Sequence, residues 1–275
     1  MEPKRKGPLY WTLATLLLIV WISPILASLL TSLKTLEELN QGLYWTLPQT
    51  FSLGNYIEAF TVGKFSTYFL NSLLITLPTV IGVLFFASLN GYVLAKLRFR
   101  WNQKLMLIFL GGMLLPFQIL LIPVFYLSNH FLNTHDTRLG VVLFHISFQL
   151  GFGSFFMRNF IKTIPDGIIE AARIDGCNEW RIYSTMVIPL MRPALAALAT
   201  LLFTWIWNDY LWSLILIQTD QLKPITAGLQ NLKGQWISSY HLQSAGAVIA
   251  AIPPVLIFAF LQKHFIRGLT MGAGK

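Results

Sequence analysis

Six long apolar runs constrain what this chain can fold into more than any other feature. They cover residues 9–33, 65–95, 105–127, 139–157, 194–217 and 242–262 of the 275, and Asp209 is the one acidic or basic side chain within them. A bilayer core about 30 Å thick is crossed by a helix of roughly 20 apolar residues. The six runs leave little chain for a separate soluble domain. The sequence therefore predicts one all-α, polytopic membrane domain over residues 1–275, with six transmembrane helices.

The positions of the basic residues predict how these spans are oriented. Fifteen of the 20 Lys and Arg residues lie on one side: in residues 4–6, 96–104, 158–192 and 263–275. Segments rich in Lys and Arg are retained in the cytoplasm, so both termini are expected to be cytoplasmic in a multi-pass protein of the cell (inner) membrane. The same bias accounts for the net charge of +9, and no nucleic-acid partner is expected.

The longest predicted cytoplasmic loop, residues 158–192, contains a charged stretch that reads EAARIDGCNEWRIYSTMVIPLMRP over residues 170–193. Pro165 and Asp166 suit the start of a helix, and Gly176 suits its end because glycine adopts the left-handed cap conformation. We therefore expect a helix over residues 165–175. Its apolar strip would consist of Ile168, Ala171 and Ala172.

A second helical pattern follows in the same loop. Trp180, Tyr183 and Val187 recur at helical spacing, and the pattern is expected to break before Pro189 and Pro193. From the residues alone, a solvated cytoplasmic hairpin explains this loop as well as a docking element does.

The loop resembles the EAA loop of ABC-importer membrane subunits. The matching residues are Glu170, Ala171, Ala172, Asp175, Gly176, Val187, Ile188 and Pro189. Cys177 departs mildly, since a small residue such as alanine is common at its place. The resemblance implies a type I ABC importer permease fold, in which this segment is a cytoplasmic coupling helix that docks in a cleft of an ATPase. The residues that it assigns to ATPase coupling are Glu170, Ala171, Ala172, Asp175, Gly176 and Pro189.

Nearly the whole chain resembles the six-span permease subunit of the maltose-type, carbohydrate group of importers. Asn208-Asp209-Tyr210 with Trp212 carries part of this likeness, and the tail LQKHFIRGLTMGAGK carries the rest. The resemblance implies a homologous second permease subunit, two copies of an ATP-binding cassette ATPase and an extracytoplasmic solute-binding protein that delivers a sugar or glycoside. It also implies that Gly272 and Ala273 contact the ATPase, although the last two residues, Gly274-Lys275, differ from the usual C-terminal sequence of that subunit.

The fifth run is the candidate substrate pathway. Trp205, Asn208 and Trp212 fall on one face of a continuous helix, and sugars bind through hydrogen bonds to amides and carboxylates and through contact with aromatic faces. With Asp209 and Tyr210 these residues form the predicted pathway, and an interfacial aromatic belt is the equal alternative. Other polar residues in the spans are expected to hydrogen-bond between helices: Asn71, Asn90, Gln118, His145 and Gln149. His145 has no second ligand at metal-binding spacing, so no metal site is expected.

Residues 34–64 and 218–241 are predicted to face outward. By the resemblance, Asn231, Lys233 and Gly234 lie near the tip of a loop that contacts the binding protein's sugar site. An ordinary polar turn is the alternative.

The sequence argues against catalysis by this chain. It contains no G-x-x-x-x-G-K-[ST] phosphate loop and no plausible catalytic constellation, so we expect no bound cofactor here and place ATP and Mg²⁺ on the partner ATPase. A permease for an amino acid or glycerol phosphate is the alternative within the importer class. A stand-alone secondary carrier or channel would need charged residues in mid-span, and a membrane-embedded enzyme would need a catalytic site.

Overall fold

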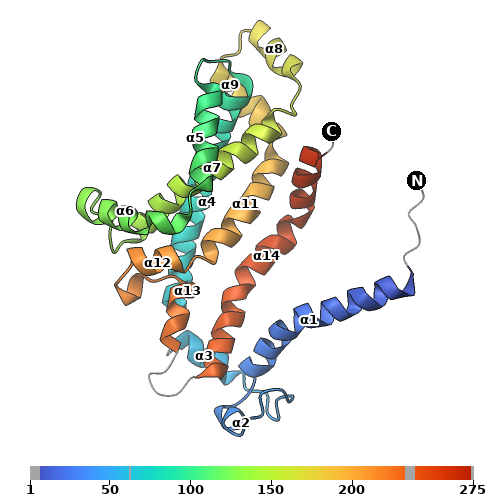
Figure 1. The fold of residues 1–275 in the computed structure, drawn as a ribbon, viewed down its shortest axis with the longest axis vertical. Helices are drawn as coiled ribbons and strands as arrows, with labels where there is room; N and C mark the ends of the chain where they lie inside the picture. The colour runs from blue at the N-terminus through green and yellow to red at the C-terminus, as the bar shows by residue number, and fades with distance from the viewer. Residues whose placement is uncertain (1–6, 62, 233–238, 274–275) are drawn as a thin grey trace. The chain divides into compact units, whose positions relative to one another are not determined.

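The computed structural model describes residues 7–61, 63–232 and 239–273, and within these ranges it contains helices and no strand. The all-α prediction is therefore confirmed for the described residues. The chain divides into two compact units: residues 1–66 with 228–252, and residues 67–227 with 253–275. Figure 1 shows the course of the chain through its helices.

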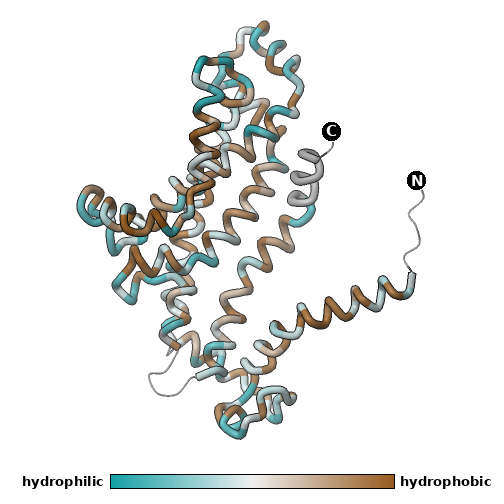
Figure 2. Tube along the Cα trace, viewed as in Figure 1, coloured by the Kyte–Doolittle hydropathy of each residue, from teal (hydrophilic) through white to brown (hydrophobic). Residues whose placement is uncertain are grey.

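Four helices are long and apolar enough to cross a membrane: α1 (Pro8–Ser32), α4 (Phe65–Lys96), α7 (Arg138–Ile161) and α14 (Tyr240–Ala273, which meets the criterion over Tyr240–Lys263). Two bent helix pairs pass the same test together, which allows up to six spans among the described residues. The second pair, Glu179–Leu190 with Arg192–Trp207, begins in the loop that was predicted to be cytoplasmic and ends before residues 208–217 of the predicted fifth span. Figure 2 shows hydrophobic residues along these helices and hydrophilic residues gathered near α8 and α9.

The third predicted span is not the straight helix expected over residues 105–127. It consists of α5 (Asn102–Leu114), then η1 (Phe117–Leu120), α6 (Leu121–Tyr126) and η2 (Leu127–Phe131), and the two halves are bent by 92°. The break falls at Leu115 and Pro116. Proline lacks a backbone donor and pushes the residue before it toward extended geometry, and Leu115 accordingly has φ −67° and ψ 128°.

The second helical pattern of the charged loop is confirmed, but the prediction that it breaks before Pro189 is wrong. The helix runs through α9 (Glu179–Ile182), η3 (Tyr183–Val187) and α10 (Ile188–Leu190), and it ends at Met191. The next helix, α11 (Arg192–Trp207), has Pro193 in its first turn, and the two parts are bent by 73°. Pro189 follows directly on η3, which is a π-helical turn, and such a turn interrupts the regular hydrogen-bond pattern that a proline inside an α-helix would otherwise break.

Helices α4, α7 and α11 approach closely in the second unit. A Cβ atom on Gly153 of α7 would lie 2.8 Å from Ala87 Cβ of α4, so only glycine permits this approach. One turn away, Asn90 Nδ2 donates a hydrogen bond to Ser154 Oγ at 3.2 Å. Small residues and amide bonds of this kind hold helices together in a bilayer, where apolar contacts alone give little preference for protein over lipid. The interhelical role predicted for Asn90 is confirmed.

The first unit contains α1, α2 (Leu36–Asn40), α3 (Gly54–Thr61) and η5 (Leu229–Leu232). The loop after α1 is ordered by buried charges, because the ammonium of Lys34 donates to the backbone oxygens of Leu43 and Tyr44. The carboxylate of Glu38 accepts from the Gln49 and Thr50 amides at 3.2 and 3.1 Å. These bonds replace the water that a buried ion would otherwise need.

Candidate functional site

The charged loop contains the predicted short helix, α8 (Asp166–Ile174), and ends it with a glycine. Gly176 has φ +78°. Its amide donates to the Arg173 oxygen at 3.1 Å, and the Cys177 amide donates to the Ala172 oxygen at 3.0 Å. This pair of bonds is the Schellman motif. A Cβ on Gly176 would meet nothing within 4 Å, so the backbone conformation and not the available space demands glycine.

The residues of the apolar strip predicted on α8 are divided between a buried and an exposed side of the helix. Ile169 and Ala172 form the buried face, each 2% exposed, whereas Ile168 and Ala171 lie on the exposed face. Ile174 is 86% exposed on the same helix. Both Ile168 and Ile169 stand at helical spacing from Ala172, and tertiary packing places Ile169 on the buried face.

Two polar contacts of Lys96 fasten the start of α8 to the end of α4. The Lys96 ammonium lies 2.6 Å from Asp166 Oδ1 and also donates to the Ile164 oxygen at 2.6 Å. The Lys96 hydrogen bond and positive charge hold the pKa of Asp166 below its usual value. This carboxylate therefore remains ionised at neutral pH. The Lys96 side chain is itself only 5% exposed, so Asp166 is the countercharge of a buried ammonium.

A second set of contacts joins α8 to α9 and again to α4. Arg173 Nε donates to Glu179 Oε1 at 2.7 Å, and Tyr92 Oη donates to Glu179 Oε2 at 2.5 Å. The same carboxylate thus holds one residue of α8 and one residue of α4. With the Lys96 contact, α8 is linked to the last turns of α4 directly at its start and through Glu179 of α9 at its end.

The fifth predicted span is broken, which corrects the single helical face expected for Trp205, Asn208 and Trp212. Helix α11 ends at Trp207, and α12 (Leu211–Leu216) begins three residues after Asn208. Trp212 is 4% exposed, whereas Trp205 is 44% exposed. Asn208 Nδ2 donates back to the Thr204 oxygen at 2.8 Å. The side chains therefore do not line one continuous stripe.

Asp209 causes this break. Its carboxylate accepts hydrogen bonds from the amides of Trp212 and Ser213 at 3.3 and 3.0 Å and from Ser213 Oγ at 2.9 Å. An aspartate that bonds to backbone donors ahead of it starts a new helix instead of continuing the old one. His145 Nε2 of α7 lies 3.5 Å from Asp209 Oδ2. Neither ring nitrogen of this buried histidine forms a hydrogen bond with a described residue, so His145 lies beside Asp209 without the interhelical hydrogen bond that was predicted for it.

Aromatic rings surround the break. The rings of Phe144 and Trp212 have centroids 3.7 Å apart, and those of Phe152 and Trp205 lie 5.0 Å apart in an edge-to-face arrangement. Tyr210 is 37% exposed. Trp212 is thus committed to packing against α7, and Trp205 and Tyr210 are the more accessible of the predicted pathway aromatics.

The residues predicted to contact the binding protein and the ATPase lie in or next to segments outside the described residues. Asn231 belongs to η5, and Lys233 and Gly234 lie outside the described residues. Gly272 and Ala273 are the last two residues of α14. Within the described ranges no group of three or more His, Cys, Asp and Glu side chains could hold a metal ion.

Sequence reasoning missed one polar cluster. It includes Tyr68, Asn71 and Ser72 of α4 together with Asp136 and Arg138 beside α7. Only Asn71 was singled out from the sequence. The spacing of Tyr68, Asn71 and Ser72, which places three polar side chains on one helix face, was the available signal.

Comparison with known proteins places these features in a family. The family model described as "Binding-protein-dependent transport system inner membrane component" matches residues 87–271. The osmoprotective compounds uptake permease protein GgtD of Synechocystis is 32% identical over 98% of this chain and 93% of its own length. The arabinooligosaccharides transport system permease protein AraQ of Bacillus subtilis is 34% identical over 94% of this chain and 92% of its own.

A solved structure matches the fold over almost the whole chain. It is the crystal structure of a bacterial ABC transporter involved in the import of the acidic polysaccharide alginate. One of its chains aligns with a TM-score of 0.81 and 25% identity, covering 96% of this chain and 99% of that chain.

Proposed function

Because the chain belongs to the family of binding-protein-dependent transport system inner membrane components, we propose that it is one permease subunit of an ATP-driven importer for a sugar or glycoside. It would pair with a homologous permease, dock two copies of an ATPase and receive solute from an extracytoplasmic binding protein. ATP and Mg²⁺ would be bound by the ATPase, and this chain would carry no catalytic residue. Both of its termini would be cytoplasmic.

The observation that carries this proposal is the attachment of α8. Its exposed side carries two isoleucines, Ile168 and Ile174, at a largely hydrophilic end of the second unit, and both are available for contact with a protein partner. Its buried face and its contacts with Lys96 and Glu179 tie it to α4. A helix that offers one face to a partner and is fastened by the other can transmit closure of ATPase subunits as a rigid-body movement.

The solute class is supported by the relatives. Their names refer to arabinooligosaccharides, starch degradation products and alpha-glucosides, and the matching crystal structure is that of an alginate importer. The accessible Trp205, Asn208 and Tyr210 near the break in the fifth span suit a solute with hydroxyl groups and apolar C–H faces. We propose that these residues, and not the packed Trp212, lie along the pathway.

The partners can be tested by gentle purification of the tagged chain from its own membrane. We expect mass spectrometry to identify an ATPase and a second permease. The reconstituted complex should then take up radiolabelled malto- or arabino-oligosaccharides in the presence of ATP and the binding protein. Purification of this chain alone, with ion-driven uptake after reconstitution, would show that it is a secondary carrier. An intact complex that takes up only an amino acid or glycerol phosphate would refute the sugar assignment.

A further inference from the structure

A cluster of buried polar side chains lies in the first turns of α4, at the opposite end of that helix from α8. Tyr68, Asn71 and Ser72 share one face of α4 and are each 1% exposed. Burying such groups costs free energy unless they form hydrogen bonds. All three bond to one segment, residues 216–225, which links α12 to α13 (Ile225–Gly228) and is called the α12–α13 segment below.

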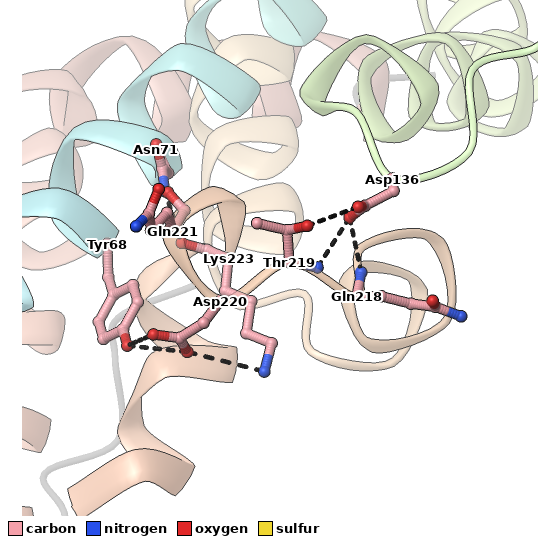
Figure 3. Close-up of polar contacts among 8 residues, drawn as sticks. All are labelled: Tyr68, Asn71, Asp136, Gln218, Thr219, Asp220, Gln221 and Lys223. Atoms are coloured by element: carbon pink, nitrogen blue, oxygen red, sulfur yellow. Dashed lines mark hydrogen bonds and ion pairs between the residues drawn. The ribbon is translucent and has the colours of Figure 1, made fainter.

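The bonds from α4 reach both side chains and backbone of this segment (Figure 3). Tyr68 Oη donates to both carboxylate oxygens of Asp220 at 3.0 Å. Asn71 Nδ2 donates to the backbone oxygens of Gln221 and Lys223 at 2.8 and 2.9 Å. The Lys223 ammonium lies 3.8 Å from Asp220 Oδ1. Both amide hydrogens of the buried Asn71 are therefore used to hold the α12–α13 segment.

The other side of the same segment is held by Asp136, just before α7 (Figure 3). Its carboxylate accepts from the amides of Gln218 and Thr219 at 2.9 and 2.8 Å and from Thr219 Oγ1 at 2.6 Å. Its own amide donates to the Leu216 oxygen at 2.8 Å. Asp136 has φ +55°, a conformation that aspartate tolerates better than most residues. The Thr219 hydrogen bonds hold the pKa of Asp136 below its usual value.

Arg138 and Ser72 complete the arrangement. Arg138 Nε, at the start of α7, donates to Asn71 Oδ1 at 2.9 Å, and Ser72 Oγ accepts from the Ile225 amide at 2.8 Å. The α12–α13 segment is thus hydrogen-bonded along its length to α4 on one side and to the base of α7 on the other, and Arg138 joins these two supports. We call Tyr68, Asn71, Ser72, Asp136 and Arg138 the polar clamp.

We propose that the polar clamp holds the α12–α13 segment on α4 and α7 throughout the transport cycle, so that contact of a binding protein with the loop that follows is transmitted to those helices. Asp136 and Asn71 act as positioning residues in this arrangement. The inference rests on the proposed function, because it takes the loop around residues 228–236 to be the binding-protein contact.

The benefit of the clamp follows from comparing it with an unsupported α12–α13 segment. A connection of ten residues without these bonds would sample many conformations, and the binding protein would engage only the fraction with the correct geometry. The apparent dissociation constant rises by the inverse of that fraction. A contact made on a flexible connection would also move the connection instead of α4. The clamp removes both losses, since each side chain that supports the segment belongs to α4, to the start of α7 or to the residues just before α7.

Asp136→Asn and Thr219→Val test the clamp, with Glu37→Gln as the matched control. Both clamp variants keep side-chain shape, and Glu37→Gln changes an exposed acidic residue of another outward-facing loop. The readout is ATPase activity of the reconstituted complex, titrated with the solute-binding protein used in the uptake assay and loaded from a malto- and arabino-oligosaccharide mixture. We expect each clamp variant to raise the half-saturating binding-protein concentration, by about tenfold for Asp136→Asn, which corresponds to about 1.4 kcal/mol. Basal ATPase activity and the maximal rate should be unchanged, as should the control.

A cysteine pair tests whether the clamp stays closed. Asp136→Cys combined with Thr219→Cys should form a disulfide where the hydrogen bonds were. We expect the oxidised protein to regain the wild-type half-saturating concentration and the reduced protein to lose it. Oxidised protein without binding-protein-stimulated ATPase activity, together with active reduced protein, would show that the segment must detach during the cycle and would overturn the proposal.

Hydrogen exchange gives a readout that needs only ATP and vanadate as probes. The amides of Gln218, Thr219 and Ile225 should remain protected both in the nucleotide-free complex and in the vanadate-trapped complex. Loss of protection in either state would contradict a permanent clamp. If the wild-type complex responds to no binding protein, the proposed function fails. If the wild type responds and the clamp variants respond equally well, the clamp alone fails.

Discussion

Replacing Gly176 by valine tests the coupling assignment most directly. A residue with a β-carbon in the left-handed conformation costs about 1–2 kcal/mol relative to the right-handed one, and a β-branched residue such as valine is worse placed there than most. If the backbone relaxes instead, the two hydrogen bonds of the Schellman motif are lost, at about 1 kcal/mol each. Either route costs about 2 kcal/mol, so the population of correctly ended α8 falls by roughly 30-fold at most.

The assay is uptake and binding-protein-stimulated ATPase activity of the reconstituted complex. We expect Gly176→Val to insert and assemble but to lose most of the stimulated ATPase activity, because the exposed face of α8 no longer meets its partner in one orientation. Gly176→Asn should retain more activity, since asparagine tolerates the left-handed conformation. Gly42→Val is the matched control: Gly42 has φ +77° and nothing within 4 Å of an added Cβ, so it suffers the same backbone strain in a different loop.

Normal coupling by Gly176→Val would refute this reasoning if hydrogen exchange also showed that the Gly176 and Cys177 amides had lost their protection. Such a result would mean that the end of α8 is free to rearrange without consequence. An equal loss of stimulated ATPase activity in Gly42→Val would also contradict the coupling assignment. The defect would then follow from general destabilisation of the chain and not from the position of α8.

Three further predictions concern other contacts. Lys96→Met should reduce stimulated ATPase activity while leaving the amount of assembled complex unchanged on gel filtration, because it frees the start of α8 from α4. Asp209→Ala should lower the melting temperature of the complex, since loss of a helix-starting carboxylate costs about 1 kcal/mol, and an unchanged melting temperature would contradict its role. The lowered pKa of Asp136 means that its ionised form stabilises the folded chain above about pH 4 and that this contribution is lost as the pH falls through that lowered value. The melting-temperature difference between wild type and Asp136→Ala should therefore be constant from about pH 7 to pH 4 and should shrink below that.

The accuracy of the sequence predictions depended on how local each feature was. Helix α8 could be predicted almost residue by residue, because Pro165 starts it, Gly176 ends it, and both effects act through the neighbouring backbone. Its buried face could not be predicted, because the choice between Ile168 and Ile169 is made by packing against distant residues. Likewise the apolar runs indicated where the membrane spans lie but not where they bend.

The break in the fifth span was the larger error. Its residues are apolar enough to continue the helix, and Asn208-Asp209 could equally have been two polar positions on a helix face. The signal was present in the preference of aspartate for bonding to backbone donors just ahead of it. That signal competes with the hydrophobic pattern, and only the arrangement around Asp209, with His145 from α7 beside it, decides the outcome.

The polar clamp illustrates a different limit. Tyr68, Asn71 and Ser72 form a pattern visible in the sequence, but their partners lie about 150 residues away along the chain. Asp136 meets Thr219 across a shorter but still long gap of 83 residues. No local rule pairs such positions, so the sequence could show that α4 has a polar face and could not show what that face holds.

Helix α4 is the element common to both sets of contacts. Its first turns carry the polar clamp, and its last turns carry Tyr92 and Lys96, which hold α8. The distance between these ends is roughly 40 Å at 1.5 Å per residue, enough to cross a bilayer core. A signal from an outer loop to a cytoplasmic ATPase then needs no chain of small side-chain adjustments. In the proposed importer, one helix that is hydrogen-bonded near each end to a segment proposed to meet a partner can carry that signal as a displacement of the whole element.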